Sequence, residues 1–104
     1  MNIDIEAMRA NAQKASVLLS AMANEKRLVI LCQLIDGERS VNELAKMLDT
    51  RQSTVSQHLA LLRKDGFVES RREGQTQYYS LAGDEARAVL ETLYSVYCNG
   101  SRSD

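Results

Sequence analysis

The stretch Thr50–Val68, with the sequence TRQSTVSQHLALLRKDGFV, constrains the fold more than any other part of the chain. A stripe of apolar residues runs through it at the i, i+4, i+7 spacing of one helix face: Val55, Leu59 and Leu62. Short polar residues open the same stretch: Gln52, Ser53, Thr54, Ser56 and Gln57. Such side chains can read base edges in a major groove, because Gln bonds adenine bidentately and Ser and Thr suit several bases. An ordinary solvated surface helix has the same composition, so the neighbouring sequence decides between the two interpretations.

A shorter helix and a tight turn precede this stretch. Ser40 and Glu43 form an S-x-x-E capping box in front of a helix with the apolar residues Val41, Leu44, Ala45 and Leu48. The segment 49–51, Asp-Thr-Arg, then connects the two helices. A short helix, a tight turn and a longer helix with a polar start are the pattern of a helix-turn-helix.

A β-hairpin is predicted after Gly66, where the helical periodicity ends. Two β-prone runs, 67–72 and 76–81, flank the turn residues Glu73, Gly74 and Gln75. Arg71 and Arg72 lie close to the tip, and beside a recognition helix such a hairpin is a wing that places cations on phosphate or in a minor groove. Residues 51–75 hold five basic and three acidic residues, a net charge of +2, whereas the whole chain has −1. Any surface for nucleic acid must therefore come from local clustering.

Two longer helices are predicted at the ends of the chain, and both carry wide apolar stripes. The first holds Ile5, Met8, Ala12, Ala15, Leu19 and Met22, and the last begins near Asp84 and holds Ala86, Val89, Leu90, Leu93, Val96 and Tyr97. Asn99-Gly100 gives the last helix a stop signal, and residues 101–104 are expected to fray. We expect the two end helices to form a dimer surface, although the first could instead fold back onto its own core.

A second helix begins at the N-cap Asn24 and extends to about Ile35, before a turn at residues 36–38. The whole chain, residues 1–104, is expected to be one mostly α-helical domain with a small β-hairpin, in the order of four helices, two strands and a fifth helix. With 44% hydrophobic and 26% charged residues the composition is that of a soluble globular protein. No membrane span and no secretory signal are present, so we expect a cytoplasmic protein in which a structural disulfide is unusual.

Over nearly its whole length the chain resembles the ArsR family of winged-helix bacterial repressors. The resemblance is carried by ANEKRLVILCQL, SVNELAKML and QSTVSQHLALLRKDGFVESRREGQTQYYSL. It implies a homodimer on an imperfect palindrome of double-stranded DNA, with contacts from Arg51, Gln52, Ser53, Thr54, Ser56, Gln57, His58, Arg71 and Arg72. His58 either reaches DNA or braces the helix. Where the family commonly has Ser, this chain has Arg51, so Thr50 is expected to cap the helix and Arg51 to contact phosphate.

Within that family, the segments ILC at 30–32 and YSVYC at 94–98 resemble the sulfide- and redox-responsive branch, which includes biofilm growth-associated repressors and HlyU-like regulators. This narrower resemblance implies that Cys32 and Cys98 pair through a disulfide or polysulfide bridge that releases DNA. Whether the inducer is a persulfide or a peroxide stays open, as does an activator that displaces a silencer. The residues alone do not decide whether the two thiols are inert or reactive. Cys32 lies in an apolar stripe, and the negative end of a helix disfavours a Cys98 thiolate.

Other functions have less support in the sequence. A thiolate metal site of the kind found in related repressors needs a C-x-C-like pair in the third helix, where this chain has ELAKML at 43–48. With two Cys and the single His58, one subunit cannot build a closed tetrahedral zinc site, so no metal or other cofactor is expected. No catalytic motif or Gly-rich phosphate loop is present, and we expect no enzyme activity.

Overall fold

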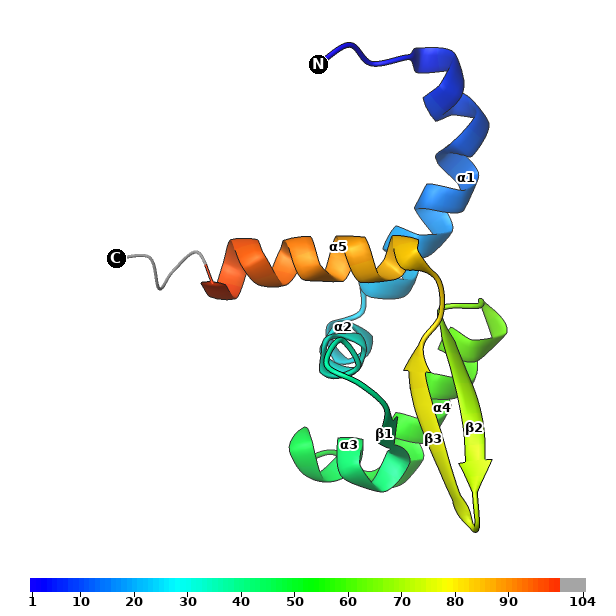
Figure 1. Ribbon diagram of the computed structural model, residues 1–104, viewed down its shortest axis with the longest axis vertical. Helices are drawn as coiled ribbons and strands as arrows, with labels where there is room; N and C mark the ends of the chain where they lie inside the picture. Colours follow the sequence, from blue (N-terminus) through cyan, green and yellow to red (C-terminus); the bar gives the residue numbers. More distant parts are fainter. Residues whose placement is uncertain (100–104) are drawn as a thin grey trace.

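The computed structural model describes residues 1–99 and has five α-helices and a small antiparallel sheet (Figure 1). In chain order these are α1 (Ile5–Met22), α2 (Glu25–Gln33), β1 (Arg39–Ser40), α3 (Val41–Met47), α4 (Gln52–Lys64), β2 (Val68–Glu73), β3 (Thr76–Leu81) and α5 (Asp84–Tyr94), which the π-helix η1 (Ser95–Asn99) continues. The predicted winged helix-turn-helix order is confirmed, with β1 as an additional strand. The tail predicted to fray lies outside the described residues.

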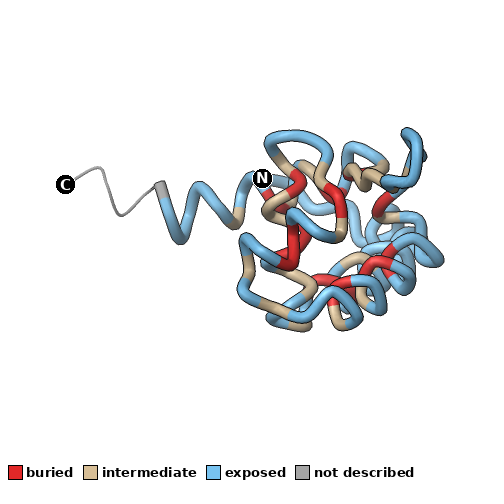
Figure 2. The backbone as a smooth tube through the Cα atoms, turned by 90° about the horizontal axis from the view of Figure 1, so that it is seen from below, coloured by how far each residue is buried: buried red, intermediate tan, exposed pale blue. Residues whose placement is uncertain are grey.

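The core is formed by residues of α2, α3, α4, α5, the base of the sheet and the end of α1. Its buried segments are drawn in red in Figure 2. The predicted stripe of α4 forms its centre, since Val55, Leu59 and Leu62 have at most 1% of their surface exposed. Burying one such side chain stabilises the fold by about 1.5–3 kcal/mol. The stripe therefore fixes which face of α4 is left for solvent.

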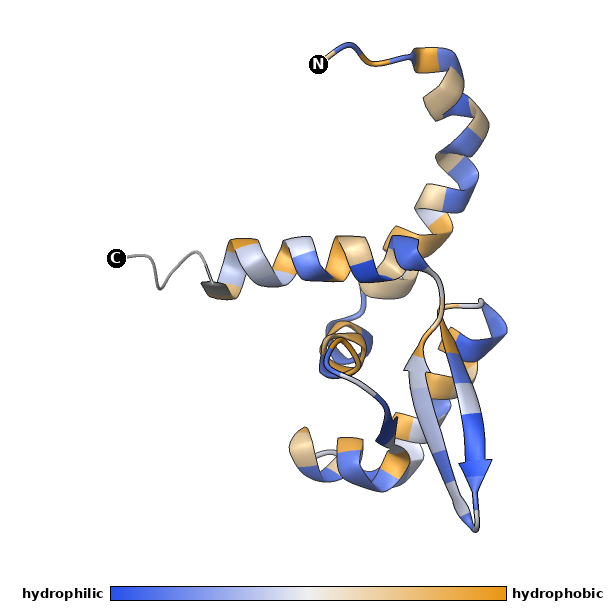
Figure 3. Cartoon of the chain, viewed as in Figure 1, coloured by the Kyte–Doolittle hydropathy of each residue, from blue (hydrophilic) through white to orange (hydrophobic). Residues whose placement is uncertain are grey.

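Helix α1 and the end of α5 extend away from this core (Figure 1), and apolar residues occur along both helices (Figure 3). Of α1, only Ala21 and Met22 at its end are buried, while the exposed residues of the two helices include Ile5, Met8, Val17, Leu19, Tyr94, Val96 and Tyr97. The first helix therefore does not fold back along its length onto its own core. No helix in the described part of the chain combines the length and apolarity that crossing a membrane needs.

Two arginines connect the end helices to α2 through hydrogen bonds to backbone carbonyls. Arg27 donates from Nε to the carbonyl of Ala21 at 2.9 Å and from Nη2 to that of Ser20 at 3.3 Å, so it occupies the acceptors at the end of α1. Arg87 of α5 donates to the carbonyl of Ile35, just beyond the end of α2, at 2.9 Å. Arg87 thereby links α5 to the residue just beyond α2.

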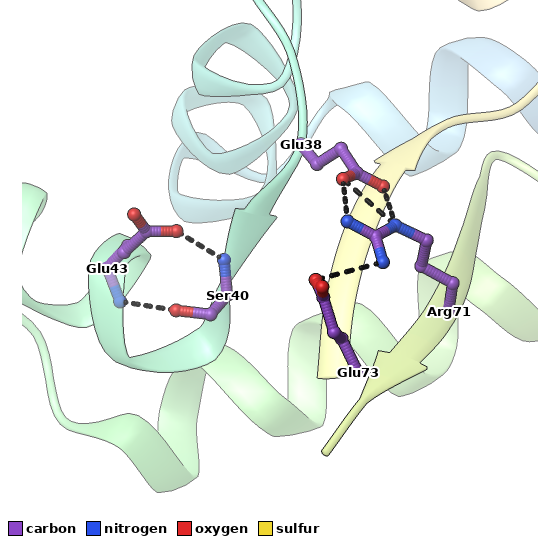
Figure 4. Close-up of polar contacts among 5 residues, drawn as sticks. All are labelled: Glu38, Ser40, Glu43, Arg71 and Glu73. Carbon is purple, nitrogen blue, oxygen red and sulfur yellow. Dashed lines mark hydrogen bonds and ion pairs between the residues drawn. The ribbon is translucent and has the colours of Figure 1, made fainter. Parts of the chain in front are cut away.

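The predicted capping box in front of α3 is confirmed. The backbone N–H of Glu43 donates to Oγ of Ser40 at 3.1 Å, and that of Ser40 donates to Oε1 of Glu43 at 2.8 Å (Figure 4). Both bonds satisfy N–H groups that the helix start would otherwise leave without a partner. Asn24 likewise accepts from the N–H of Arg27 and caps α2, as predicted.

The turn between α3 and α4 is a Schellman motif built on an aspartate. The N–H of Thr50 donates to the carbonyl of Ala45 at 3.0 Å, and that of Asp49 to Lys46 at 3.3 Å. Asp49 takes the left-handed position with φ of +50°, which an Asp side chain tolerates better than most. The predicted N-cap role of Thr50 is wrong, because its hydroxyl donates to the carbonyl of Leu48. Arg51 is the N-cap and makes no side-chain cap bond.

The sheet has the strand order β1-β3-β2, and both pairings are antiparallel. Glu73 pairs with Thr76, so the wing closes in a two-residue loop whose first member, Gly74, has φ of +63°. Tyr78 lies between Ser40 on one side and Arg71 on the other. The two-residue β1 thus ties the wing to the start of α3.

Candidate DNA-binding surface and cysteine pair

The outward face of α4 carries the polar residues that the sequence singles out. Gln52, Ser53, Ser56 and Gln57 are all exposed. At about 100° per residue, Ser53 and Gln57 lie nearly opposite the buried stripe. These four side chains are therefore accessible to a ligand while the stripe holds the helix in place.

The first turn of α4 has no acidic residue to offset the helix dipole. The exposed N-cap Arg51 adds a cation. Because the N-terminus of a helix bears a partial positive charge and unsatisfied N–H groups, this end is suited to an anion such as a phosphate.

Thr54 and His58 lie on the flank of α4 and are half-buried. His58 shares a pocket with Lys26, Val29 and other residues of α2, and its Nδ1 is buried with no hydrogen-bond partner. Burial, together with the positive charges of Arg27 and Lys26, lowers the pKa of His58. Of its two predicted roles, bracing α4 against α2 fits this placement better than reaching a base.

Asn42 of α3 is a site residue that the sequence did not reveal. Its Oδ1 accepts from Nε2 of Gln52 at 2.9 Å, so the first residue of α4 is tied to α3. An exposed Asn in the first turn of a short helix has no pattern that would mark it. Only the spacing of the two helices brings it to Gln52.

Arg71 and Arg72 point to opposite faces of the wing, because side chains alternate along a strand. Arg71 shares a face with Tyr78, and its guanidinium carbon lies 5.0 Å from the centre of that ring. It donates to both carboxylate oxygens of Glu38 at 2.7–3.0 Å and to Glu73 at 3.2 Å (Figure 4). Arg72 is exposed on the other face, the one whose base packs on the core through Val68. The two arginines therefore have different surroundings.

Cys32 and Cys98 come from different helices and interact electrostatically. Cys32 lies in the last half of α2 and is half-buried, whereas Cys98 lies in η1 and is exposed. Burial raises the pKa of the Cys32 thiol, and the charge of a Cys98 thiolate raises that pKa further. The two sulfur atoms are thus near enough for one to sense the charge of the other.

The end of α5 changes to a π-helical turn that contains Cys98. On an uninterrupted α-helix, the eight residues from Leu90 would leave Cys98 about 80° away from that fully buried side chain. In a π-turn each residue advances less around the axis, because hydrogen bonds close over five residues rather than four. The π-turn therefore leaves Cys98 at a smaller angle from Leu90 than an uninterrupted α-helix would.

Comparison with known proteins agrees with this geometry. A family model described as bacterial regulatory protein, arsR family, matches residues 24–70. The transcriptional activator HlyU of Vibrio cholerae is 49% identical over 100 residues, which cover 96% of this chain and 93% of that protein.

Two solved structures extend the likeness to the fold. The transcriptional repressor BigR from Xylella fastidiosa superposes with a TM-score of 0.86 at 34% identity, over 92% of this chain and 98% of that one. The homodimeric winged helix-turn-helix DNA-binding domain from Mycobacterium bovis, a possible ArsR-family regulator, gives 0.77 at 32% identity, over 99% and 94%. By sequence and by fold, this chain belongs to the arsR family of bacterial regulatory proteins.

Proposed function

We propose that this chain is a homodimeric transcriptional regulator that binds an imperfect inverted repeat of double-stranded DNA. The observation that carries the proposal is the exposed polar face of α4, held opposite the buried stripe and beside the wing. In the dimer, two α4 helices enter successive major grooves about 34 Å apart. Specific affinity is on the order of 10⁻⁸ M or tighter at moderate salt.

The contacts divide by type. Ser53, Ser56 and Gln57 read bases, with Gln52 held beside them by Asn42. Arg51 and the wing supply the phosphate contacts that set the register on the duplex. Thr54 and His58, which are half-buried, support α4 from its flank.

The dimer forms through α1 and α5. Leu19 and Tyr97 are 58% and 76% exposed on helices that project from the core. Exposed apolar patches of this kind mark interaction sites, and the M. bovis relative is homodimeric. Sedimentation of Leu19→Asp should show a monomer at micromolar concentration. The matched control Met47→Asp changes an exposed apolar residue of α3 and should stay dimeric.

DNA affinity is switched by bridging Cys32 and Cys98 with a reactive sulfur species or an oxidant. With a peroxide, both thiols lose hydrogen, a disulfide forms and the peroxide is reduced to water. With persulfides, one cysteine takes the outer sulfur of a first persulfide, which leaves as a thiol. A second persulfide, reduced to a thiol and sulfide, then oxidises this cysteine persulfide and the other cysteine to a trisulfide. Either bridge joins α5 to α2, and a shift of the two recognition helices that costs about 1–3 kcal/mol lowers affinity by roughly 5- to 150-fold.

At its promoters the protein acts as a repressor that dissociates from DNA when Cys32 and Cys98 are bridged. A second candidate, favoured by 49% identity to the activator HlyU, is a regulator that raises transcription by displacing a silencing protein. The two functions share one DNA-binding surface. Transcription in vitro with and without a silencer on the template separates them.

Footprinting of the reduced protein on duplexes selected for binding from a random-sequence library tests DNA binding itself. We expect two protected half-sites one helical turn apart, and a lack of any protected inverted repeat would remove the proposal. Intact mass after each treatment tests the bridge: a loss of two hydrogens identifies a disulfide, and added sulfur identifies a polysulfide.

A further inference from the structure

Arg71 is surrounded by acids on the outer face of the wing. All three of its guanidinium nitrogens donate to carboxylates, two of them to Glu38 and the third to Glu73. The ring of Tyr78 lies against the same guanidinium. One positive charge is thus matched by two negative charges, so the cluster as a whole is negative and repels phosphate.

The Arg71–Glu38 pair also connects the wing to the segment before α3, which few backbone hydrogen bonds join to the sheet. Glu38 directly precedes β1, which has two residues and leads into the capping box of α3 at Ser40. Arg71 lies on β2, at the far side of the three-stranded sheet. A two-residue strand contributes few ladder bonds, so the bidentate pair, a strong and directional contact, adds a second tie between the wing and the helix-turn-helix.

We propose that Arg71 is a positioning residue that sets the wing against α3 through Glu38, and that Arg72 is the wing residue that contacts phosphate. The proposal rests on the proposed DNA binding. It assigns the opposite faces of β2 to different tasks. The competing account is that Arg71 leaves its carboxylates when DNA arrives and pairs with a phosphate.

A charge-preserving substitution separates the two accounts. Lys keeps the positive charge that a phosphate contact needs, but it lacks the planar fork that binds both oxygens of Glu38. Arg71→Lys should therefore weaken operator binding as much as Arg71→Gln, by about fivefold or more. The swap Glu38→Arg with Arg71→Glu restores the pair without a cation at position 71 and should recover most of this loss.

The salt dependence of binding supplies an independent measure. Each phosphate contact contributes about 0.9 to the slope of log affinity against log salt. Arg72→Gln should flatten the slope by about this amount, whereas Arg71→Gln should leave it unchanged. If Arg71→Lys binds like the wild type, Arg71→Gln flattens the slope and the swap fails to rescue, Arg71 is a phosphate contact and the proposal is overturned.

Hydrogen exchange of the free full-length protein tests, in the absence of DNA, whether the Arg71–Glu38 pair holds the wing against α3. We expect Arg71→Lys to speed exchange of the β1 and β3 amides, the swap to restore their protection, and Arg72→Gln to leave it as in the wild type. Unchanged exchange in Arg71→Lys would contradict the proposal. If the wild type showed no operator binding, the proposed function would fail, while these exchange rates would still decide whether Arg71 holds the wing.

Discussion

Cys32 in α2 and Cys98 in η1 lie close enough for the charge of Cys98 to raise the pKa of Cys32. The two helices that carry them are held together by the bond from Arg87 to the carbonyl of Ile35. One of these helices packs on α4 and the other projects toward the proposed dimer surface. A bond between the two sulfur atoms would therefore join α2 to η1 and, through the packing of α2 on α4, affect the position of α4.

The two thiols should differ in reactivity. Cys98 is exposed, whereas Cys32 is half-buried and has a raised pKa, so less of it is thiolate at neutral pH. We expect iodoacetamide to modify Cys98 faster than Cys32. Time-resolved mass spectrometry of the reduced protein measures both rates, with the single variants Cys32→Ser and Cys98→Ser to assign them. Faster modification of Cys32 would contradict this order.

Replacing Gln57 with Ala should change sequence preference rather than general affinity. The side chain lies at the centre of the exposed face of α4. Losing a bidentate contact with a base costs about 1–3 kcal/mol at one position of each half-site. Binding to a set of single-base operator variants measures the effect. If the variant instead weakened binding evenly on every sequence, as expected for Arg72→Gln, Gln57 would not be a base reader.

The turn before α4 should tolerate Asn but not Val at position 49. Asp49 has a left-handed backbone, which costs a β-branched residue about 1–2 kcal/mol. Asp49→Val should lower the free energy of unfolding by this amount in urea at a fixed protein concentration, and the control Asp49→Asn should remain near the wild type. Equal stability of the Val variant would mean that the turn rearranges freely.

Stability should fall as the pH drops from about 7 to 5, in part because of His58. Its pKa in the folded protein is below the ordinary value of 6.5, so the unfolded chain takes up the proton first. The contribution is fully present above pH 6.5 and is lost as the pH falls toward the lowered pKa. His58→Gln should reduce this slope in urea unfolding measured at several pH values. An unchanged slope would show that His58 does not titrate in this range.

Local patterns in the sequence were enough to predict the elements that depend on neighbouring residues. The stripe of Val55, Leu59 and Leu62, the capping box at Ser40 and the two-strand wing all follow from spacing over a few positions. Each of these features depends on hydrogen bonds and burial among residues that are close in the sequence, so the sequence alone predicts it.

Features that depend on how distant segments meet could not be predicted. Glu38 reaches Arg71 only because β1 joins the sheet, and two residues are too few to give a strand signal. Asn42 meets Gln52 only because of the angle between α3 and α4. The π-turn that contains Cys98 also has no recognisable signal in the sequence. The cap at α4 was assigned wrongly because the hydroxyl of Thr50 bonds backward into the Schellman turn.

Operator release by single-cysteine variants tests directly whether the cysteine pair controls DNA binding. Fluorescence anisotropy should show that Cys32→Ser and Cys98→Ser, when reduced, bind within a few-fold of the wild type, because the two cysteines lie on α2 and η1 rather than on α4 or the wing. A persulfide or peroxide should release the wild-type protein, and a thiol reductant should restore binding. Neither variant should respond. If both variants still dissociate from the operator when oxidised, Cys32 and Cys98 are not the sensor.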